Sequence, residues 1–569
     1  MATPTSEPDR VWRKKYPAGV PPTVEVPELL LPELVQASVD RYADRPALLY
    51  YGTHLSYREF WTASERFAAG LAREGIREGD RVAVYLPNCP VYPIALFGIL
   101  RLGAVVVQIS PLYIGQDLSR LIRDSGPKAI VTLELLYPNL AQVRDAAPIP
   151  LAFVARTKDQ YPFYVRPFVN GVLRRQGLPT TVPTDPSVRS FRTALRTPGT
   201  VPSLHRDPAT TVAVFQYTGG TTGRAKAAML SHRNLVANVV QLEAWDTVKT
   251  PGREVALASI PFFHIYGLTV ALLLPLRMGG AVVMQTRPEI RELLKLIDRY
   301  QPTQFPGVPA LYHAFIHQPD IARHRIRSIR FCLSGSAPLP VEVARRFEEL
   351  TGGKIIEGYG LSETSPATHA NPVVGERRAG SIGLPLPNTD QRVVDLETGT
   401  RVLPVGEVGE LAVRGPQVML GYFGQPEETA AVLSDGWFRT GDIARLDADG
   451  YAYIVDRKKD MIDVGGLKVY PRDVEEVLFQ HPAVADAAVI GVPDPELGEV
   501  VKAFVVRKAG GTVTADELIG FVRERLAHYK APRTVEFRDS LPRSGVQKVL
   551  RRVLREETTA PPPATAPAP

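Results

Sequence analysis

A glycine- and threonine-rich segment with one lysine, residues 217–226, is the strongest candidate for chemistry in the sequence. It reads YTGGTTGRAK and follows the β-branched run Thr211–Phe215, which predicts a strand. Three glycines let the backbone turn tightly so that successive N–H groups can face a phosphate, while threonine hydroxyls and Lys226 add donors. A plain turn is the alternative. Ala225 and Ala227 break the Walker A pattern and no G-x-G-x-x-G is present, so a γ-phosphate transferase and a dinucleotide dehydrogenase are both disfavoured.

The segment 358–364, GYGLSET, places an aromatic ring between two glycines and a carboxylate four residues after it. The ring of Tyr359 could stack on a purine, because its small neighbours leave a face open. Glu363 supplies a hard oxygen of the kind that Mg²⁺ accepts. Taken alone, a turn with a surface glutamate is the simpler interpretation.

Two further segments carry charged residues that could bind a nucleotide. Asp442, in DGWFRTGD, could accept hydrogen bonds from ribose hydroxyls, and Arg457, in DRKKD, could bind a hydroxyl or a phosphate. A surface salt-bridge cluster is the alternative. Lys548 ends LPRSGVQK, a flexible turn in which a lysine is usually solvated. These residues therefore become informative only together.

The elements that must position these residues alternate between strand and helix. Residues 31–130 and 211–387 show helical and β-rich runs in turn, which predicts parallel α/β layers. The predicted elements there are helices at 31–42 and 92–102 and strands at 81–86 and 104–109. The proline-rich stretch 157–208 reads as an irregular surface excursion rather than a domain boundary. Short strands at 391–395, 408–414 and 451–455 predict a small β-rich subdomain.

After residue 456 the pattern changes to a compact α+β unit. It predicts helices at 471–480 and 514–526 and strands at 484–491, 500–507 and 533–537. The fold class is therefore α/β: a large N-terminal domain with a β-rich subdomain, followed by a small α+β domain. The domains we expect are an extended lead-in (1–30), an N-terminal domain (31–456), a C-terminal domain (457–556) and a disordered Pro/Ala tail (557–569).

Composition narrows the class of protein. With 569 residues, 44% hydrophobic and 22% charged, the chain is typical of soluble globular proteins of two to four domains. The net charge of +7 is mild over this length and favours a solvated basic face over polyanion or membrane binding. Cys89 and Cys332 are too few for a four-cysteine metal site or a disulfide framework, although they could form one bridge, and such sparing use suits a reducing compartment.

Neither the N-terminus nor the apolar runs predict membrane insertion. No apolar h-region of a signal peptide is present in the first thirty residues. Charged or glycine residues interrupt the runs 91–107 and 268–284, which read as buried helix, turn and strand. We expect a cytoplasmic protein.

Taken together, the four segments resemble the adenylate-forming superfamily, which includes acyl- and aryl-CoA synthetases, beetle luciferases and peptide-synthetase adenylation domains. Further stretches match in the same order: PFFHIYG at 261–267, GVP at 307–309, SGSAPL at 334–339 and VYP at 469–471. The resemblance runs from about residue 30 to about residue 556, nearly the whole folded chain.

The resemblance implies two half-reactions in one site, using ATP, Mg²⁺ and coenzyme A. A carboxylate first attacks the α-phosphorus of ATP to give an acyl adenylate and pyrophosphate. The thiol of coenzyme A then attacks the activated carbonyl and releases AMP. The small domain would turn about a hinge at Lys459 between the two steps.

The resemblance also implies roles for individual residues. Lys548 would bridge the carboxylate and the α-phosphate, with His264 beside the carboxylate and Glu363 at the metal. The remaining roles are the β/γ-phosphate cradle (Thr218, Gly219, Gly220, Thr221, Thr222, Gly223, Lys226), Mg²⁺ (Thr218, Glu363), the adenine (Ser336, Ala337, Pro338, Gly358, Tyr359, Gly360, Ser362), the ribose (Asp442, Arg457), the acyl group (His264, Val308, Gly335) and coenzyme A (Gly465, Gly466, Leu467, Lys468).

The chain departs from the family pattern at several places. Gly219, Ala225, Ala227 and Gln547 replace the usual Ser, Pro, Gly and Gly. Both key lysines remain, so we expect altered rates rather than loss of activity. Asp463 lies where some relatives carry a lysine that serves the thioester step, which puts the details of coenzyme A binding in doubt.

The acid is expected to be an uncharged fatty acid of medium or long chain. Amino-acid-activating relatives carry an aspartate in the 261–267 region, and this chain has none there. The apolar runs 265–276 and 304–309 suit a hydrophobic acyl slot, although simple core is an equal alternative. The lead-in at 11–21, VWRKKYPAGVP, is similar to the start of bacterial long-chain fatty-acid CoA ligases.

Several alternatives remain at the level of sequence. They are an aryl or phenylpropanoid-CoA ligase, an acyl-AMP ligase that transfers to a carrier protein, a luciferase-like oxidation, and a non-catalytic scaffold. We expect no nucleic-acid partner. Peripheral association with the inner membrane face and a homodimer are both left open.

Overall fold

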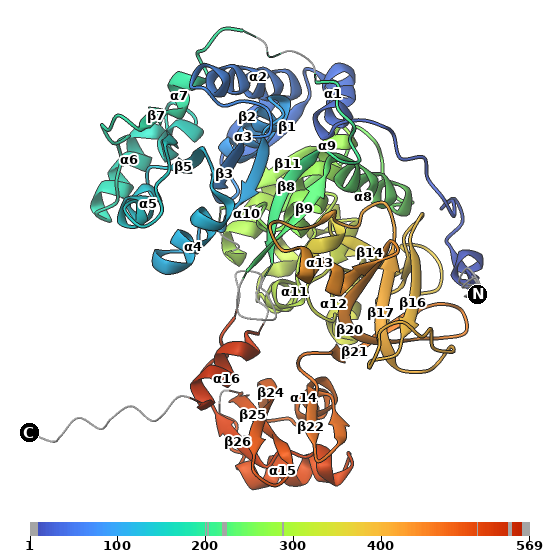
Figure 1. Ribbon diagram of the computed structural model, residues 1–569. Coiled ribbons are helices and arrows are strands. Elements are labelled where there is room, and N and C mark those ends of the chain that lie inside the picture. Colours follow the sequence, from blue (N-terminus) through green and yellow to red (C-terminus); the bar gives the residue numbers. More distant parts are fainter. Residues whose placement is uncertain are drawn as a thin grey trace, which may run out of the picture. The chain divides into compact units, whose positions relative to one another are not determined.

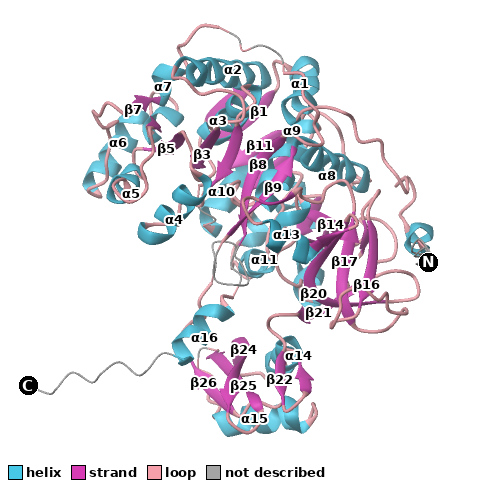
Figure 2. Ribbon diagram, viewed as in Figure 1, coloured by secondary structure: helices cyan, strands magenta, loops and turns pink. Residues whose placement is uncertain are grey.

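The computed structural model describes residues 10–199, 201, 204–218, 225–286, 289–508, 510–543 and 549–559, which form two compact units (Figure 1, Figure 2). The first comprises Met1–Gln391, Val413–Phe438 and Asp449–Tyr451, and the second Arg392–Ala412, Arg439–Ala448 and Ala452–Pro569. The predicted α/β class, with a larger N-terminal and a smaller C-terminal domain, is confirmed. The proposed boundaries at residues 30, 456 and 556 stay predictions.

An eight-stranded sheet forms the centre of the first unit, in the order β18-β9-β8-β4-β3-β5-β6-β7. The six strands from β8 to β7 pair in parallel, as the alternating pattern predicts, and β9 and β18 are antiparallel. The strands are β3 (Arg81–Tyr85), β4 (Val105–Gln108), β5 (Ala129–Leu133), β6 (Leu151–Ala155), β7 (Val188–Ser190), β8 (Val212–Thr218), β9 (Lys226–Ser231) and β18 (Gly421–Tyr422). Their apolar runs are buried because helices cover the sheet.

Figure 2 shows the strands of the first unit lying among helices. The helix α3 is buried from Val91 to Leu100, since it crosses the interior rather than the surface. The principal helices are α1 (Leu31–Tyr42), α2 (Tyr57–Arg73), α3 (Val91–Arg101), α4 (Gly115–Ser125), α5 (Tyr137–Val143), α8 (His232–Trp245), α10 (Ile290–Tyr300), α11 (Pro309–Ile316), α12 (Val341–Thr351) and α13 (Pro426–Val432).

Two four-stranded sheets carry the remaining motifs of the first unit. One runs β10-β11-β1-β2 and the other β12-β13-β14-β15. Their bounds are β1 (Pro46–Tyr50), β2 (Thr53–Ser56), β10 (Val255–Ala258), β11 (Ala281–Met284), β12 (Phe331–Ser334), β13 (Lys354–Gly360), β14 (Ala367–Ala370) and β15 (Leu384–Pro385). The segments SGSAPL and GYGLSET therefore begin at the ends of the neighbouring parallel strands β12 and β13.

Both apolar runs are internal elements, as predicted. The first forms α3 and β4, and the second forms a π-helix, η3 (Gly267–Leu273), then α9 (Leu274–Arg277) and β11. All residues of η3 are buried. None of the described helices has the length and apolar character needed to cross a membrane.

The lead-in is anchored, although much of it is extended. A single 3₁₀ turn, η1 (Val11–Lys15), buries Trp12 to 2% exposure. The Tyr16 ring packs edge-on against Trp245 at 5.3 Å between centroids, and its hydroxyl donates to the Pro385 carbonyl at 2.6 Å. These contacts hold residues 10–16 on the first unit.

The stretch 157–208 contains regular structure that the sequence analysis did not predict. It forms η2 (Thr157–Gln160), α6 (Arg166–Arg175), β7 and α7 (Phe191–Ala194). Pro167 does not prevent the helix, because it stands in the first turn of α6 where its missing N–H has no partner to lose. The prediction of an irregular segment was wrong for these residues, but β7 does pair with β6 inside one unit, so no domain boundary falls here.

The predicted β-rich segment forms a five-stranded sheet in the order β16-β17-β20-β19, with β21 paired to β20. The strands are β16 (Asp390–Val394), β17 (Gly409–Arg414), β19 (Leu433–Ser434), β20 (Trp437–Leu446) and β21 (Ala452–Arg457). In the register of β20 and β21, Asp442 lies opposite Arg457.

The C-terminal part of the second unit is the α+β fold that the sequence predicts. Its sheet runs β23-β22-β25-β24, with β26 parallel to β25. The elements are β22 (Ile462–Val464), β23 (Leu467–Val469), α14 (Pro471–Phe479), β24 (Val484–Asp494), β25 (Gly498–Arg507), α15 (Ala515–Arg523), β26 (Thr534–Phe537) and α16 (Arg551–Thr559). Two clusters of buried hydrophobic residues lie on this sheet.

Helix α16 was not predicted, and it includes residues 557–559, which we had placed in the tail. It contributes one fully buried side chain, Leu554, which packs with Ile490 and Phe504. A helix with so short an apolar face leaves little periodic signal in the sequence. Residues 560–569 of the predicted tail lie outside the described residues.

Candidate active site

The strand that precedes the phosphate-loop candidate is present, and it forms a hairpin with the strand that follows. In this hairpin Thr218 of β8 lies opposite Lys226 of β9. Thr218 is half-buried at the end of its strand. The predicted cradle residues between them, Gly219, Gly220, Thr221, Thr222 and Gly223, lie outside the described residues. The hairpin thus fixes both ends of the predicted loop.

Lys226 has a buried side chain with two specific contacts. Its ammonium lies 2.5 Å from Glu428 Oε2 and 5.1 Å from the centre of the Tyr422 ring. The residue is 7% exposed, so the charge is compensated by a carboxylate and an aromatic face instead of water. An anion bound at this ammonium would compete with Glu428 for it. Neither Glu428 nor Tyr422 was identified from the sequence.

Glu363 lies in the short turn η6 (Ser362–Thr364) and is 9% exposed. The Tyr422 hydroxyl donates to its Oε1 at 2.9 Å, and its backbone carbonyl accepts from Met419 N–H at 2.8 Å. Burial, followed by the neighbouring Glu363 charge, raises the pKa of Tyr422 above its ordinary value. Glu363 is therefore not the surface glutamate of the simpler interpretation.

Tyr422 connects the two predicted charges, because its hydroxyl contacts Glu363 while its ring lies under Lys226. The turn η6 also packs against both β8 and β9, the strands that end in Thr218 and begin with Lys226. The structure thus brings together three predicted residues from two separate motifs: Thr218, Lys226 and Glu363. The site could hold an anion at Lys226 and a cation at Glu363.

The donor set of Glu363 and Thr218 is suited to magnesium. In the described part of the chain no group of three or more His, Cys, Asp or Glu side chains could hold a metal by itself. Mg²⁺ typically binds one or two protein oxygens, with waters and substrate phosphates completing its shell. The buried carboxylate of Glu363 and the hydroxyl of Thr218, near the predicted phosphate loop, match this coordination preference of Mg²⁺.

The aromatic segment Gly358-Tyr359-Gly360 ends strand β13. The half-buried Tyr359 ring meets the buried His369 ring edge-on, at 5.9 Å between centroids. A Cβ at Gly358 would lie 2.7 Å from Leu333, and one at Gly360 would lie 1.9 Å from the Pro366 carbonyl oxygen. The two glycines are therefore required by close packing, whereas the sequence analysis explained them as leaving the ring face open.

The predicted adenine wall follows strand β12. Ser336 is half-buried and adopts φ of 72°, while Ala337 and Pro338 are exposed. Ser362, which we placed on the same nucleotide, is half-buried in η6 beside Glu363. These residues lie at or just after the ends of the neighbouring strands β12 and β13. The residues predicted to bind adenine therefore lie at the same end of one sheet.

The three residues predicted for the acyl group are linked through Tyr266. Its hydroxyl lies 3.1 Å from the Gly307 carbonyl, next to Val308, and a Cβ at Gly335 would lie 3.4 Å from its ring. Tyr266 N–H donates to His264 Nδ1 at 3.3 Å. Tyr266 was only part of a matching stretch in the sequence, and its positioning contacts become visible in the fold.

The loop that carries His264 is held by residues far away in the sequence. Asn88 donates to the carbonyls of Ala258 and Ile260 at 3.0 and 2.9 Å and accepts from Phe262 N–H at 2.7 Å. The Gln216 side chain donates to the Phe263 carbonyl at 3.2 Å. Asn88 is 3% exposed and was missed, because an isolated asparagine before a helix has no distinctive pattern. The apolar runs beside this loop are buried, and the acyl slot stays a prediction.

In the second unit, Asp442 and Arg457 form an ion pair, with Arg457 Nε 3.3 Å from Asp442 Oδ1. The Asp442 side chain is 5% exposed and that of Arg457 is 35% exposed. The pair is thus buried on one side, unlike the surface cluster considered as its alternative. Its role toward a ribose stays a prediction.

The predicted hinge residue Lys459 lies in a turn after β21, between two residues that are tied to the second unit. Lys458 Nζ lies 3.0 Å from Glu410, and Asp460 pairs with Arg551 and Arg555 at 3.2 and 3.1 Å. Burial and the neighbouring Arg457 charge lower the pKa of Lys459. Burial opposes ionisation of Asp460, yet the two guanidinium groups hold the pKa of its carboxyl below the ordinary value.

The predicted coenzyme A segment is a two-residue turn between β22 and β23. Gly465 and Gly466 have φ of 60° and 87°, which suits a type I′ hairpin and favours glycine. Asp463 Oδ1 accepts from Gly466 N–H at 2.8 Å, and Asp463 Oδ2 lies 2.5 Å from Lys468 Nζ. Leu467 is 50% exposed. The unusual Asp463 therefore has a local partner and closes the turn.

Lys548 and Gln547 lie outside the described residues, which stop at Arg543 and resume at Val549. Arg543 and Val549 form an antiparallel bridge, and Leu550 N–H donates to the Pro542 carbonyl at 2.8 Å. Arg543 also forms an ion pair with Asp486. The segment that contains Lys548 thus begins and ends at adjacent positions on the second unit.

Comparison with known proteins gives matches along almost the whole chain. Residues 35–423 match the family model of the AMP-binding enzymes, and residues 473–548 match that of the AMP-binding enzyme C-terminal domain. The chain is 42% identical to a long-chain-fatty-acid–CoA ligase of Bacillus subtilis, over 96% of this chain and 98% of the relative. It is 35% identical to 4-coumarate–CoA ligase-like 9 of Oryza sativa, over 98% of this chain and 97% of the relative.

A solved structure shares the fold. It is ATP-bound MatB from Rhodopseudomonas palustris, which is 30% identical and superposes with a TM-score of 0.81 over 93% of this chain and 99% of that one.

Proposed function

The chain belongs to the AMP-binding enzyme family, and from this we propose that it is an ATP-dependent acyl-CoA synthetase for a medium- or long-chain fatty acid. It would form acyl-AMP and pyrophosphate, and then acyl-CoA and AMP. The observation that carries the proposal is the connected set of Lys226, Tyr422 and Glu363 beside the predicted phosphate loop. The fatty acid is supported by the higher identity to the fatty-acid ligase than to the 4-coumarate ligase-like relative.

The first half-reaction joins two anions, so charge neutralisation and alignment are the main tasks of the protein. Lys226 would bind the β/γ-phosphates, which would replace Glu428 as the partner of its ammonium. Thr218 and Glu363 would hold Mg²⁺, which neutralises phosphate charge when bound. Lys548 would neutralise the carboxylate and the α-phosphate as they meet.

The remaining residues would bind and orient the substrates. Tyr359 would stack on adenine beside Ser336, and Asp442 with Arg457 would bind the ribose. His264 would lie beside the carboxylate, fixed by the Asn88 network that holds its loop. The Gly465–Lys468 turn would contact coenzyme A.

The two cysteines support a reducing compartment, since Cys89 and Cys332 are both free and buried. We therefore propose a cytoplasmic location.

One assay separates the proposed function from its alternatives. ATP–pyrophosphate exchange is measured with fatty acids of graded length and with aryl acids, and then repeated with coenzyme A and thioester detection. We expect exchange and thioester with fatty acids. Exchange without thioester would favour transfer to a carrier protein, a preference for aryl acids would favour the phenylpropanoid alternative, and the absence of both signals would overturn the proposal.

A further inference from the structure

The excess positive charge of the chain is concentrated in one segment. Residues 156–198 contain seven arginines, one lysine, two aspartates and no glutamate, a net charge of +6 out of +7 for the whole protein. A net charge of +7 spread evenly over 569 residues would favour a solvated basic face. A concentrated charge instead creates a local field that can attract an anionic partner.

The same segment exposes large apolar side chains. Phe163 is 79% exposed, Phe168 75%, Tyr164 62% and Val172 52%. Among the described residues, three of the four large exposed aromatic side chains lie in these ten positions, the fourth being Phe479. Clustered exposed apolar residues beside polar ones mark interaction sites more often than scattered ones do.

Helix α6 exposes part of this apolar surface to solvent. Leu173 is its buried residue, whereas Phe168 and Val172 are exposed one turn apart and share a face. Arg166 Nε donates to the Tyr161 carbonyl at 3.0 Å, which ties the helix start to the turn that carries Phe163 and Tyr164. The exposed rings are therefore presented by ordered backbone.

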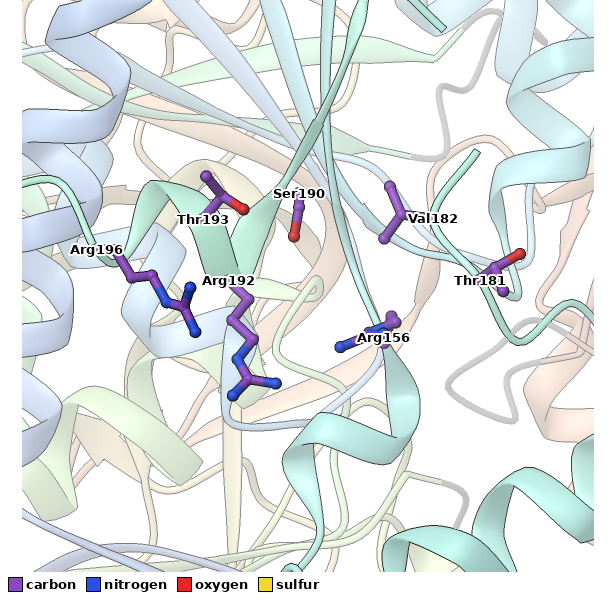
Figure 3. A pocket seen from close by; sticks show the side chains of 7 residues that line it. All are labelled: Arg156, Thr181, Val182, Ser190, Arg192, Thr193 and Arg196. Atoms are coloured by element: carbon purple, nitrogen blue, oxygen red, sulfur yellow. The ribbon is translucent and has the colours of Figure 1, made fainter. Parts of the chain in front are cut away.

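A hollow of about 440 Å³ lies in the same segment and is lined mainly by polar and basic side chains. Figure 3 shows side chains that line it, among them the three arginines Arg156, Arg192 and Arg196, with Ser190 and Thr193 beside them. Asp159 lies 3.0 Å from Arg156 and 3.8 Å from Arg192, and within the described chain Arg196 forms no ion pair. Two of the three cations thus share one carboxylate and the third pairs with none in the described chain, which leaves positive charge for an anion such as a phosphate.

Asp159 also connects the hollow to the apolar surface. It belongs to η2, its carboxylate pairs with the two hollow arginines, and its carbonyl accepts from Arg166 of α6. The cations and the aromatic rings are therefore parts of one surface, which we call the α6 surface: Phe163, Tyr164, Phe168 and Val172 with Arg156, Arg192 and Arg196.

We propose that the α6 surface docks on a lipid bilayer that contains anionic headgroups. The aromatic rings enter the interface, and the arginine-lined hollow accepts a lipid phosphate. Exposed aromatic residues beside arginines are the composition that binds such interfaces. A second copy of the chain would bring the same net charge of +6 and be repelled, so the charge favours a bilayer over self-association. Binding does not depend on which acid is activated, and so it goes beyond the proposed function.

The test is co-sedimentation of the full chain with vesicles. The vesicles contain phosphatidylcholine alone or equal amounts of phosphatidylcholine and phosphatidylglycerol, at low and high salt. We expect binding to the anionic vesicles only, weakened by salt. Arg192→Gln with Arg196→Gln should weaken it about fivefold per arginine. The matched control is Arg325→Gln with Arg327→Gln, two exposed arginines outside the surface, and should bind as the unmodified chain does.

A second pair of variants tests the rings. Phe163→Ser with Phe168→Ser should weaken binding roughly tenfold per ring, and Phe479→Ser, which removes the other exposed phenylalanine, should not. Thermal unfolding and ATP–pyrophosphate exchange with a detergent-solubilised acid should be unchanged in all variants.

Three results would overturn the proposal: no preference for anionic vesicles, equal effects of surface and control variants, or a dimer that forms without vesicles and is lost in the surface variants. A chain that binds vesicles but makes no acyl-CoA would instead contradict only the proposed function.

Discussion

The two regions assigned to the two half-reactions differ sharply in burial. In the first unit, Lys226, Tyr422 and Glu363 are each less than one-tenth exposed and contact one another through one tyrosine. In the second unit, Asp463 and Lys468 pair across a turn with side chains 47% and 45% exposed. Buried charges that lose a partner cost several kcal/mol, whereas exposed ion pairs contribute about 0–1 kcal/mol.

We propose that this difference reflects the different tasks of the two regions in the two half-reactions. The buried group in the first unit is fixed before any substrate arrives, as a site built for charge neutralisation requires. The exposed turn in the second unit can exchange its partners at little cost, as a surface that contacts a substrate in only one step requires.

The largest effect is expected at Lys548. Lys548→Ala should slow ATP–pyrophosphate exchange about 10²- to 10³-fold, because it would remove the cation that we propose neutralises the charge developing in the first half-reaction. Thioester formation from pre-made acyl-AMP should remain largely intact. Equal losses in both steps would mean that the lysine is not confined to the first.

Tyr422→Phe should reduce exchange by about 10- to 100-fold. The change removes the hydroxyl that donates to Glu363 and keeps the ring under Lys226, so a buried carboxylate loses about 1.5–3 kcal/mol of hydrogen bonding. Tyr453→Phe is the matched control, since its hydroxyl contacts Asp447 in the second unit. If the exchange rate falls equally in both variants, Tyr422 does not organise the site.

Asp442→Ala should raise the KM for ATP roughly tenfold without unfolding the protein, because a ribose contact contributes equally to ground and transition states. Steady-state rates at varied ATP measure the effect. Asp494→Ala, which breaks a pair with Arg533 elsewhere in the second unit, should leave KM unchanged. An unchanged KM and kcat in Asp442→Ala would return the residue to a purely structural ion pair.

The last prediction concerns stability in acid instead of activity, and it also distinguishes the two units. Burial lowers the pKa of His232 in the first unit to about 4, where its Nδ1 accepts from Leu31 N–H at 3.0 Å. As pH falls from about 6.5, the unfolded chain takes up a proton that the folded chain resists, so stability should drop by up to about 3 kcal/mol. The described histidines of the second unit, His481 and His528, are not buried.

Calorimetry at about pH 7.5 and about pH 5 measures this loss, which should reach roughly 2 kcal/mol at the lower pH. His232→Asn should make the first unit less sensitive to pH, because an amide can accept the Leu31 hydrogen bond and does not titrate. A pH dependence identical to that of the unmodified chain would exclude His232 as its source.

The features predicted from the sequence depend on neighbouring residues, whereas the features that were missed depend on contacts between distant residues. The strand before Thr218, the α+β unit and the order of the motifs were correct, because each depends on a short run of residues. Tyr422, Glu428 and Asn88 were missed, since each acts on a partner at least 59 residues away and none stands in a distinctive pattern. Helix α16 was missed for a related reason, as its one fully buried leucine gives no period.

We propose that the small domain changes orientation about Lys459 between the two half-reactions. In the described structure the Lys459 N–H donates no hydrogen bond, so proline at this position restricts φ without breaking one. Lys459→Ala is the matched control, because it removes the ammonium and leaves the backbone free.

The most direct measurement compares both half-reactions in one preparation of Lys459→Pro. Our account predicts that pyrophosphate exchange is retained while thioester formation from pre-made acyl-AMP falls by orders of magnitude, with both retained in Lys459→Ala. Thioester formation at the normal rate in Lys459→Pro would contradict it, since no rotation about this residue would then be needed.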